Sequence, residues 1–458
     1  MQEEINLETT NSSSKKLIFF MIFCAGLGGI LYGYDIGVIS GALVFIQKAI
    51  PMGPGQMGLI VGGVLGGGLV GTLITGPLAD RFGRRTMIIT ACLIFILGVI
   101  SILMAETFTI LFLSRVLLGI AVGIVAVAVP LYLTEVAPAH IRGRSVTVFQ
   151  LLLTFGILLA YCIDLIFTES GNWHAMFAVI LLPTLFLFFS MLFLPETPRW
   201  LLSKNRPEEA KTVLLKTRPV EESEKELLQI QESLLTTKGR WKDLFVKGLW
   251  LPLSVSLLIA ICNQLTGINV LLQYAPMVIH SAGLQSESSA MFGTIGIGLV
   301  NFLGTILSFF LIDRFGRRVL LITGTAGIVL SYLGLSLLPH LALAELLQAE
   351  LSLLCLVTYI FFFAIGPGIV VWLAMSELMP TKVRGKALAL ALFANSMAAF
   401  ILSSTFLYIT SALGMSGTYL LFAGFTVIYL LVAIFMLPET KDKTLEEIQN
   451  FYQERFKH

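Results

Sequence analysis

Long apolar stretches separated by short polar segments run along almost the whole chain of 458 residues. A helix that crosses a membrane needs about 20 consecutive apolar residues, because the hydrocarbon core is about 30 Å thick. The pattern predicts twelve such helices. They are expected at residues 17–47, 56–79, 86–105, 108–134, 146–167, 174–194, 248–280, 288–312, 319–338, 348–376, 386–411 and 417–437.

The polar segments repeat three motifs in the same order, at separations of 233 to 243 residues. The copies are LADRFGRR at 78–85 and LIDRFGRR at 311–318, a glutamate seven residues before an arginine at 135–142 and 377–384, and Pro-Glu-Thr at 195–197 and 438–440. The repeat is far longer than one unit of a solenoid, so it indicates two folded halves.

These observations predict an all-α integral membrane protein with two pseudo-symmetric halves of six helices each. Paired six-helix repeats are typical of secondary transporters. The connector is charged and shows helical spacing, so short surface helices are expected there. The expected parts are an N-terminal tail at 1–16, a first half at 17–194, a connector at 195–247, a second half at 248–437 and a C-terminal tail at 438–458.

Composition and charge agree with a membrane location. Hydrophobic residues make up 56% of the chain and charged residues 13%, whereas soluble domains carry about 25% charge. Nearly all Lys and Arg lie in the connector, the tails and one set of loops; the opposite loops contain only Lys48. By the positive-inside rule, both termini and the connector are expected in the cytoplasm of a multi-pass protein in the cell membrane, with the lipid bilayer as its surroundings. The net charge of +2 favours no nucleic acid partner.

The sequence contains no motif that indicates an enzyme. It has no phosphate-binding Walker loop, no dinucleotide-binding glycine pattern and no HExxH motif. The five cysteines lie in apolar runs without CxxC spacing. We therefore expect no cofactor, no metal and no catalysis.

Acidic and basic residues recur at the cytoplasmic helix ends of both halves, where carboxylates and guanidinium groups can form bidentate pairs. If such pairs bridge the halves, they form an inner gate that breaks when the inner side opens. The alternative is that they only anchor helix ends. The predicted gate residues are Asp80, Arg84, Arg85, Glu135, Arg142, Asp313, Arg317, Arg318, Glu377 and Arg384.

Several amides interrupt the apolar runs of the predicted helices. Amides both donate and accept hydrogen bonds, so they suit neutral hydroxyl groups, and a tryptophan adds a stacking surface. Positions 269 and 273 are one helical turn apart and are expected to share a face. Hydrogen bonding between helices is the alternative for any single amide. The predicted binding residues are Gln150, Asn263, Gln264, Asn269, Gln273, Asn301, Trp372 and Asn395.

Asp35 lies deep in the first apolar run, where a carboxylate is expensive and indicates a function. Arg115, the only basic residue well inside a predicted span, is its expected partner. Protonation of Asp35 would free Arg115 and change the contacts between the first and fourth helices, so the pair is the predicted proton-coupling site. A permanent structural pair is the alternative. Asp164, near the outer end of the fifth helix, is expected to be a solvated residue at the rim.

Four motifs together resemble the sugar porter family of the major facilitator superfamily, and the resemblance covers almost the whole chain beyond residue 16. They are the paired RFGRR loops, PETPRW at 195–200, Pro-Glu-Thr at 438–440 and QLTGIN at 264–269. The resemblance implies the major facilitator fold and an alternating-access carrier for a hexose, a pentose or a related polyol, with one central site.

The resemblance also implies roles for individual residues. The residues that stand where the family holds its sugar are Gln150, Gln264, Asn269, Asn301 and Trp372. Asn263 stands where a second glutamine is usual, and Gln273 where a tyrosine is usual. Proton-coupled members carry an aspartate at the position of Asp35, whereas facilitators usually carry asparagine.

The sequence thus predicts that a functional monomer imports a monosaccharide together with protons. Two alternatives stay open. One is a sugar or polyol facilitator, or an exchanger, of the same fold; the other is a nutrient sensor that does not transport. The sequence does not distinguish among glucose, galactose, xylose, arabinose and inositol.

Overall fold

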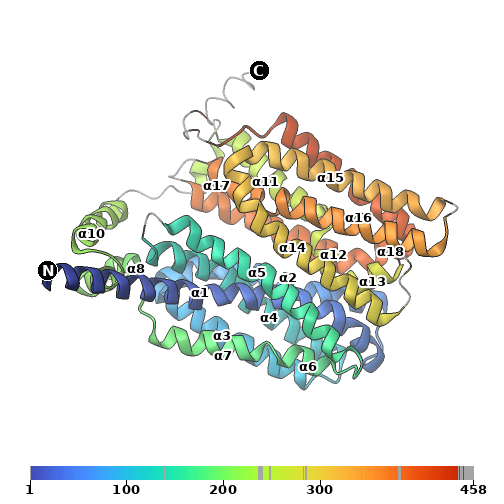
Figure 1. The fold of residues 1–458 in the computed structure, drawn as a ribbon, viewed down its shortest axis with the longest axis horizontal. Coiled ribbons are helices and arrows are strands. Elements are labelled where there is room, and N and C mark those ends of the chain that lie inside the picture. Colours follow the sequence, from blue (N-terminus) through green and yellow to red (C-terminus); the bar gives the residue numbers. More distant parts are fainter. Residues whose placement is uncertain are drawn as a thin grey trace.

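The computed structural model describes residues 2–138, 141–235, 241–246, 249–281, 283, 286–341, 343–379, 383–441, 443 and 447, without the side chains of 2–16, 235, 287 and 376. Helices make up nearly all of this described part. Figure 1 shows two groups of long, roughly parallel helices, one formed by the first part of the chain and one by the last.

The first group contains the six membrane helices expected for the first half. Its elements are α1 (Gln2–Ala49), α2 (Pro54–Phe82), α3 (Arg84–Leu103), α4 (Phe108–Val136), α5 (Arg142–Thr168) and the pair α6 (Trp173–Ala178) and α7 (Leu181–Phe193). Residues 2–16, expected as a separate tail, continue α1 as helical backbone.

The connector contains the expected short helices. These are α8 (Pro198–Ser203), α9 (Pro207–Thr217) and α10 (Val220–Leu235), followed by the 3-10 turn η2 (Trp241–Phe245). Arg218 donates from Nη2 to the carbonyl of Val136 at 2.7 Å and also pairs with Glu226. Burial lowers the pKa of Arg218 to about 10. These contacts fasten the connector to the end of α4.

The second group is built from helices that are more often broken. Its elements are α11 (Trp250–Leu265), α12 (Ile268–Gln273), α13 (Ala275–Ser281), α14 (Glu287–Phe315), α15 (Arg317–Leu337), the short η3 (Leu338–His340), α16 (Glu345–Ile365), α17 (Pro367–Glu377) and α18 (Arg384–Phe435). The Gly366-Pro367 step separates α16 from α17, since proline removes a helical hydrogen bond.

The last element, α18, contains the two final membrane helices. Its backbone is non-helical at Gly414, with φ of 67°. Arg384, at the start of α18, lies just after Glu377, and Ile434, at the other end, accepts a hydrogen bond from Arg318. Arg318 is the neighbour of Arg317, and Arg317 pairs with Glu377. Both ends of α18 therefore lie close to Arg317 and Arg318, at the same end of the molecule. The chain therefore reverses at Gly414 and gives the expected eleventh and twelfth spans.

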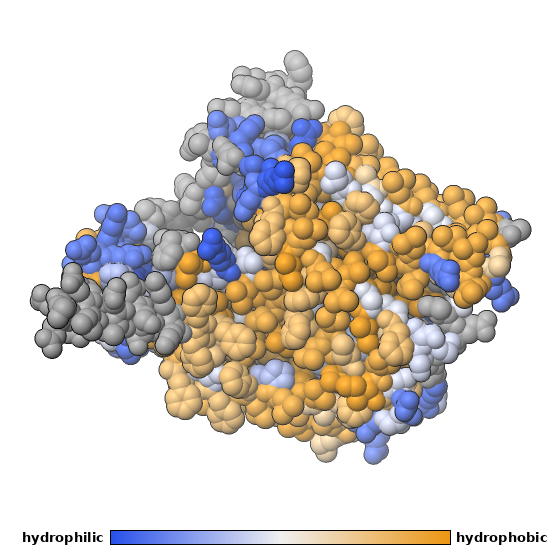
Figure 2. All heavy atoms as spheres, in the orientation of Figure 1, coloured by the Kyte–Doolittle hydropathy of each residue, from blue (hydrophilic) through white to orange (hydrophobic). Residues whose placement is uncertain are grey.

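The surface of this helical bundle is apolar. Within the described part, eleven helices are long and apolar enough to cross a membrane, α18 counting once. Large apolar side chains point outward from both groups, including Phe193 at 85% and Phe310 at 72% exposure. Figure 2 shows the resulting hydrophobic belt, with hydrophilic residues gathered mainly near the connector and the chain end. An exposed apolar surface of this extent fits the interior of a lipid bilayer.

Small residues allow the closest helix approaches within the first group. A Cβ atom at Gly67 or Gly71 of α2 would overlap the backbone carbonyls of Val116 or Ile120 on α4. Small residues spaced one helical turn apart let two helix backbones touch. Across the two groups, α2 packs against α18 and α5 against α14. These contacts enclose the centre of the molecule.

Candidate functional site

A central cavity of about 120 Å³ lies between the two groups of helices. We call the end of the molecule with the connector and the RFGRR loops the inner end, and the opposite end the outer end. The polar residues that line the cavity are Tyr32, Gln150, Thr154, Asn263, Gln264, Asn269, Asn301, Thr305, Trp372, Asn395 and Ser396.

Seven of the eight predicted binding residues line this cavity. Gln273 does not; it lies one turn beyond Asn269 on α12 and is only 1% exposed. Of the two positions expected to share a face, only Asn269 therefore lines the cavity, while Gln273, the last residue of α12, is buried in the bundle.

Three of the amides form a continuous hydrogen-bonded chain. Asn269 donates from Nδ2 to Oε1 of Gln264 at 2.7 Å, and Gln264 donates from Nε2 to Oδ1 of Asn395 at 2.9 Å. Asn395 donates in turn to the carbonyl of Ala260 at 3.0 Å. The chain fixes the orientation of each amide, and the buried Oδ1 of Asn263 beside it has no partner in the described part. Groups held in this way can bind several hydroxyls of one small molecule.

The first group contributes fewer polar groups to the cavity. Gln150 and Thr154 come from α5, and Tyr32 comes from α1. Thr154 uses its hydroxyl to donate to the carbonyls of its own helix. Tyr32 and Thr154 are not among the predicted binding residues. Tyr32 shares a helix face with Ile36, four residues on, which also lines the cavity, so helical spacing could have indicated it.

The cavity is closed toward the outer end and accessible from the inner end. Tyr161 of α5 donates to the carbonyl of Leu272 of α12 at 2.7 Å, which joins the two groups on the outer side of the cavity. Trp372, on the inner side, is 40% exposed although it lies at the centre of the molecule. Solvent therefore reaches the site along α17.

The break between α11 and α12 sets the position of Asn269. Gly267 adopts φ of 82°, a left-handed conformation that favours glycine. The carbonyl of Thr266 is released from the helix there and accepts hydrogen bonds from Tyr332 at 2.5 Å and Tyr359 at 3.0 Å. Two phenol groups thus hold the break in place.

Replacing both tyrosines by phenylalanine is expected to loosen this break. The buried Thr266 carbonyl would lose both partners, which destabilises by about 1–3 kcal/mol. We expect the Tyr332→Phe/Tyr359→Phe variant to melt at a lower temperature in detergent than the parent protein. Tyr408→Phe, at an exposed position, serves as the control. An unchanged melting temperature would show that the bonds do not support the break.

Asp35 and Arg115 form a buried ion pair beside the cavity. Nη1 of Arg115 lies 2.8 Å from Oδ1 of Asp35, and the side chains are 0% and 2% exposed. Arg115 also donates from Nε to the carbonyl of Ile60 at 3.3 Å and lies over the ring of Phe177. The pair links α1 to α4, and the same α1 lines the cavity through Tyr32 and Ile36.

The expectation that Asp164 is a solvated residue at the rim is wrong. Its side chain is completely buried, and one carboxylate oxygen accepts a hydrogen bond from the backbone N–H of Gly41 at 3.1 Å. Proximity to the end of α5 suggested exposure, but α1 covers this part of the helix through Gly41.

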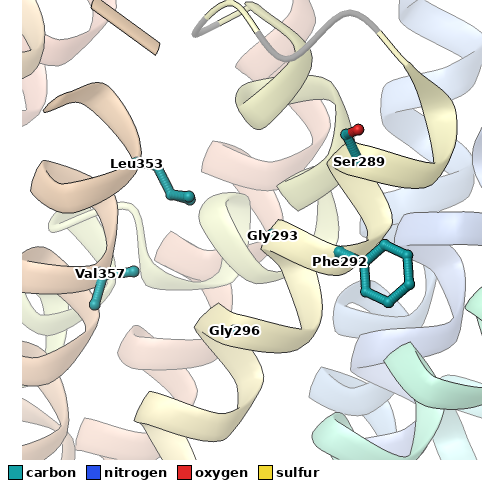
Figure 3. Close-up of a pocket in the computed structure, with 6 residues that line it drawn as sticks. All are labelled: Ser289, Phe292, Gly293, Gly296, Leu353 and Val357. Carbon is teal, nitrogen blue, oxygen red and sulfur yellow. The ribbon is translucent and has the colours of Figure 1, made fainter. Parts of the chain in front are cut away.

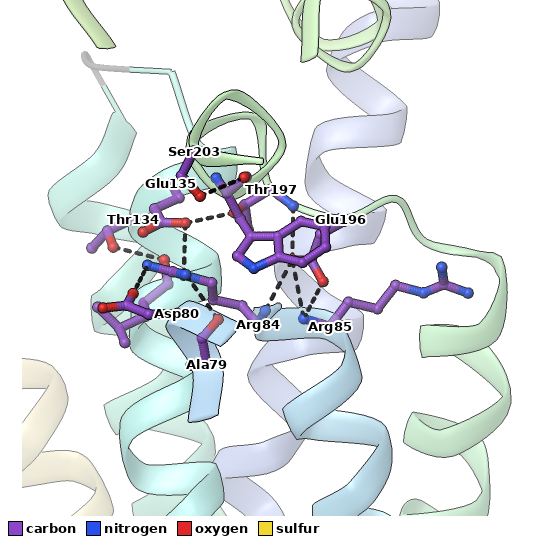
Figure 4. Close-up of polar contacts among 11 residues, drawn as sticks. Ala79, Asp80, Arg84, Arg85, Thr134, Glu135, Glu196, Thr197 and Ser203 are labelled. Atoms are coloured by element: carbon purple, nitrogen blue, oxygen red, sulfur yellow. Dashed lines mark hydrogen bonds and ion pairs between the residues drawn. The ribbon is translucent and has the colours of Figure 1, made fainter. Parts of the chain in front are cut away.

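The inner end of the first group carries a polar network around Arg84 (Figure 4). Arg84 lies 3.1 Å from Glu135 and 3.0 Å from Asp80. Glu196, of the Pro-Glu-Thr motif, accepts hydrogen bonds from the backbone N–H groups of Arg84 and Arg85. It therefore caps the start of α3, where a negative charge is favourable. Burial raises the pKa of Glu196, while these N–H donors and Arg84 act in the opposite direction.

The second group repeats this network. Arg317 lies 3.1 Å from Glu377, and Glu439 accepts from the backbone N–H groups of Arg317 and Arg318 at 2.9 and 3.1 Å. Thr440 donates to Glu377, as Thr197 does to Glu135. The repeated motifs thus build the same helix cap twice.

The predicted bridging of the halves by these pairs is not found in this conformation. Among the described residues, each arginine–glutamate pair stays within one half, because the start of α3 or α15 lies beside the inner end of α4 or α17 of the same half. Asp313 is exposed, and the structure shows no pair between it and Arg317.

The other predicted gate arginines contact different partners. Arg85 donates to the carbonyls of Met191 and Leu192, and Arg318 to that of Ile434, so both cap helix C-termini. Arg384 donates to the carbonyl of Met379 at 3.2 Å. Arg142 pairs with Glu226 of the connector at 3.1 Å instead of with Glu135.

A second, wider recess of about 390 Å³ lies between α14 and α16, toward the outer end (Figure 3). Its lining is almost entirely apolar, with Ser289 as its one hydroxyl, and its Phe292 is 64% exposed. It lies in the hydrophobic belt and contains no set of polar groups that could orient a ligand. The central cavity is therefore the candidate functional site.

The sequence matches the sugar (and other) transporter family over residues 21–452. The chain belongs to this family. The transporter is 38% identical to the probable metabolite transport protein CsbC of Bacillus subtilis over 444 residues, covering 96% of this chain and 95% of that protein. It is 34% identical to the galactose-proton symporter of Escherichia coli over 440 residues, covering 95% of each.

Solved structures agree with this assignment. The inward-open conformation of the xylose transporter XylE from Escherichia coli superimposes with a TM-score of 0.83 at 29% identity, covering 95% of this chain and 99% of that one. The expected major facilitator fold is thereby confirmed. The transporter spans nearly the full length of these relatives.

Proposed function

We propose that the transporter imports a monosaccharide, a hexose or a pentose, together with protons by alternating access. The observation that carries the proposal is the closeness of two features on α1. The helix lines an amide-rich cavity through Tyr32 and Ile36, and between them it holds Asp35 in a buried pair with Arg115. Relatives with similar sequences include a galactose-proton symporter, and the structural relative carries xylose.

Binding follows from the chemistry of the cavity. The amides Gln264, Asn269 and Asn395 present neutral donors and acceptors in fixed orientations. A sugar offers hydroxyls to such groups and an apolar C–H face to the ring of Trp372. No charged side chain lines the cavity in the described part, which favours a neutral substrate.

Coupling follows from the ion pair. While Asp35 is ionised, it holds Arg115 and ties α1 to α4. Protonation removes the attraction, so a proton from the outer side changes the balance between the outward-facing and inward-facing conformations. The sugar and the proton then bias the same helix, and the proton gradient drives sugar inward.

The remaining features of the proposal concern location and assembly. We place both termini and the connector in the cytoplasm of a cell membrane, since the basic residues gather at the inner end. The transporter works as a monomer, because the central cavity lies within one chain, and it moves its substrate without chemical conversion.

Uptake into proteoliposomes tests the function directly. Labelled glucose, galactose, xylose, arabinose and inositol are offered with an inward proton gradient and after its collapse. We expect at least one monosaccharide to accumulate above its equilibrium level only when the gradient is present. Equilibration without accumulation would indicate a facilitator, and binding without uptake a sensor.

The inner networks give a separate prediction. Arg84→Ala or Arg317→Ala removes the charge that joins α3 or α15 to the neighbouring glutamate. We expect turnover to fall at least tenfold, about 1.4 kcal/mol in the barrier, with sugar affinity nearly unchanged because the networks lie away from the cavity.

Arg81→Ala is the matched control for this prediction. Arg81 is exposed, lies in the last turn of α2 three residues before Arg84, and contacts the ring of Phe82, so its loss should leave turnover close to that of the parent. A large loss of equilibrium sugar binding at normal turnover in Arg84→Ala would contradict the assigned role.

A further inference from the structure

The recess between α14 and α16 is a hollow in the part of the surface that faces lipid. Its volume is about 390 Å³, whereas an engineered protein cavity of about 150 Å³ already binds benzene. Phe292 at its edge is 64% exposed, and Leu299 and Leu303, farther along the same face of α14, are exposed as well. The recess is therefore continuous with the hydrophobic belt, and it has room for a chain of many carbon atoms.

The walls of the recess are two helices that touch farther inward. A Cβ atom added at Gly304 of α14 would lie 2.8 Å from the Cβ of Ala364 of α16. Toward the outer end the two helices separate, and Leu353 and Val357 point from α16 across the space toward α14 (Figure 3). The recess is the wedge of space that this separation leaves.

Glycines leave the wall on α14 without side chains. A Cβ atom added at Gly296 would meet no atom of the described part within 4 Å, in contrast to one at Gly67, which would overlap the backbone of α4. At Gly293 the added atom would lie 3.2 Å from Ile279 of α13 and 3.6 Å from Leu353. Walls without partner atoms lack dispersion contacts, so an apolar molecule that fills the space gains them.

The direction and depth of the recess match an acyl chain of the outer leaflet. Its lining on α14 runs from Ser289 to Gly296, which is about 10 Å along the helix. The helix begins at the outer end, at Glu287, and one leaflet spans about 15 Å, half of the hydrocarbon core. No charged side chain of the described part lines the recess, and its one hydroxyl, on Ser289, lies toward the headgroups.

We propose that this recess is a lipid site, which holds one acyl chain of an outer-leaflet phospholipid more tightly than the rest of the belt holds lipid. A hydrocarbon chain needs no polar group to orient it, so the apolar lining suits this ligand. The same helix α14 lines the sugar cavity through Asn301 and Thr305. The bound chain therefore supports the outer half of a helix that carries residues of the central site.

Labelling with a photoreactive lipid tests the site in a membrane. The transporter is placed in vesicles of phosphatidylethanolamine and phosphatidylglycerol with a trace of phosphatidylcholine that carries a diazirine in one acyl chain. After illumination, mass spectrometry of peptides locates the label. We expect more label on Phe292 and Leu353 than on Leu420 and Ile428, which are exposed on the lipid-facing side of α18.

Gly296→Leu fills the recess with a side chain of the protein. We expect the excess label on Leu353 to disappear and sugar uptake to stay close to that of the parent, since Gly296 does not line the central cavity. Gly424→Leu is the matched control. Gly424 is exposed on α18, with no described atom within 4 Å of an added Cβ, so the label on Leu353 should not change. If Gly296→Leu does not fold, Val357→Phe fills the recess from the opposite wall.

Three results would overturn the lipid site. Label on Phe292 and Leu353 no higher than on α18 would mean that the recess holds lipid no better than the rest of the belt. Unchanged label in Gly296→Leu and Val357→Phe would place the bound chain elsewhere. Crosslinks between two copies through Phe292, without lipid label, would show that a second copy covers the recess. None of these results depends on sugar or protons, so the proposed function is tested separately.

Discussion

Asp35→Asn is expected to abolish accumulation of sugar against its gradient while exchange of labelled for unlabelled sugar continues. Asparagine has nearly the volume of aspartate and resembles the protonated acid, so it fixes the pair in its uncoupled state. The transporter can then still change conformation with sugar bound, but a proton no longer biases the change. The measurement is uptake into proteoliposomes with an imposed proton gradient, followed by counterflow in the same vesicles.

The buried position of the pair calls for a second variant. Removing one partner leaves the guanidinium of Arg115 without its counter-charge, which destabilises by about 3–5 kcal/mol. If Asp35→Asn does not fold, the double variant Asp35→Asn/Arg115→Gln removes both charges and should show the same loss of accumulation.

Glu106→Gln is the control for the loss of a carboxylate, since Glu106 is exposed between α3 and α4. Its accumulation should match that of the parent. If Asp35→Asn still concentrates sugar, Asp35 does not couple transport to protons. If both accumulation and counterflow vanish in correctly folded protein, the pair is structural.

Gln264→Ala is expected to weaken sugar binding by about five- to a hundredfold, which corresponds to roughly 1–3 kcal/mol. Gln264 is the middle member of the amide chain, so its loss removes a contact to the sugar and leaves Asn269 and Asn395 without their shared partner. Equilibrium binding of the best substrate from the uptake panel gives the affinity.

Tryptophan fluorescence provides an independent readout of the same site. Trp372 lines the cavity and is solvent-accessible, so sugar binding should quench emission in the parent and not in Trp372→Ala. Gln348→Ala changes an amide that is not part of the cavity lining and should leave affinity unchanged. Parent-like affinity in Gln264→Ala would place the sugar elsewhere.

Gln273 offers a comparison within the same helix. Its side chain is buried but does not line the cavity. Replacement by tyrosine, the residue usual in the family, should leave transport working and shift the preference among sugars by changing how α12 packs. The same equilibrium binding assay, carried out with several sugars, measures this preference.

The sequence by itself determined the membrane class, the twelve spans and the duplication. These follow from local properties: the length of an apolar run, the side on which basic residues gather and the recurrence of short motifs. The motifs at 78–85 and 311–318 also indicated helix ends, because a cluster of charged residues is too costly to place inside the bilayer. Seven of the eight predicted binding residues line the central cavity, because a polar side chain in an apolar membrane helix avoids lipid and faces the interior of the bundle.

Only the tertiary structure decided which groups meet. Asp164 and Asp35 are both aspartates in apolar runs, yet one faces a backbone N–H and the other a guanidinium. Helix packing also decides that Arg142 pairs with Glu226 and that Gln273 lies away from the cavity. The pairs of Arg84 and Arg317 stay within their halves for the same reason. A side chain's partner is set by the whole packed arrangement, and residues far apart in sequence carry no local signal of their contact.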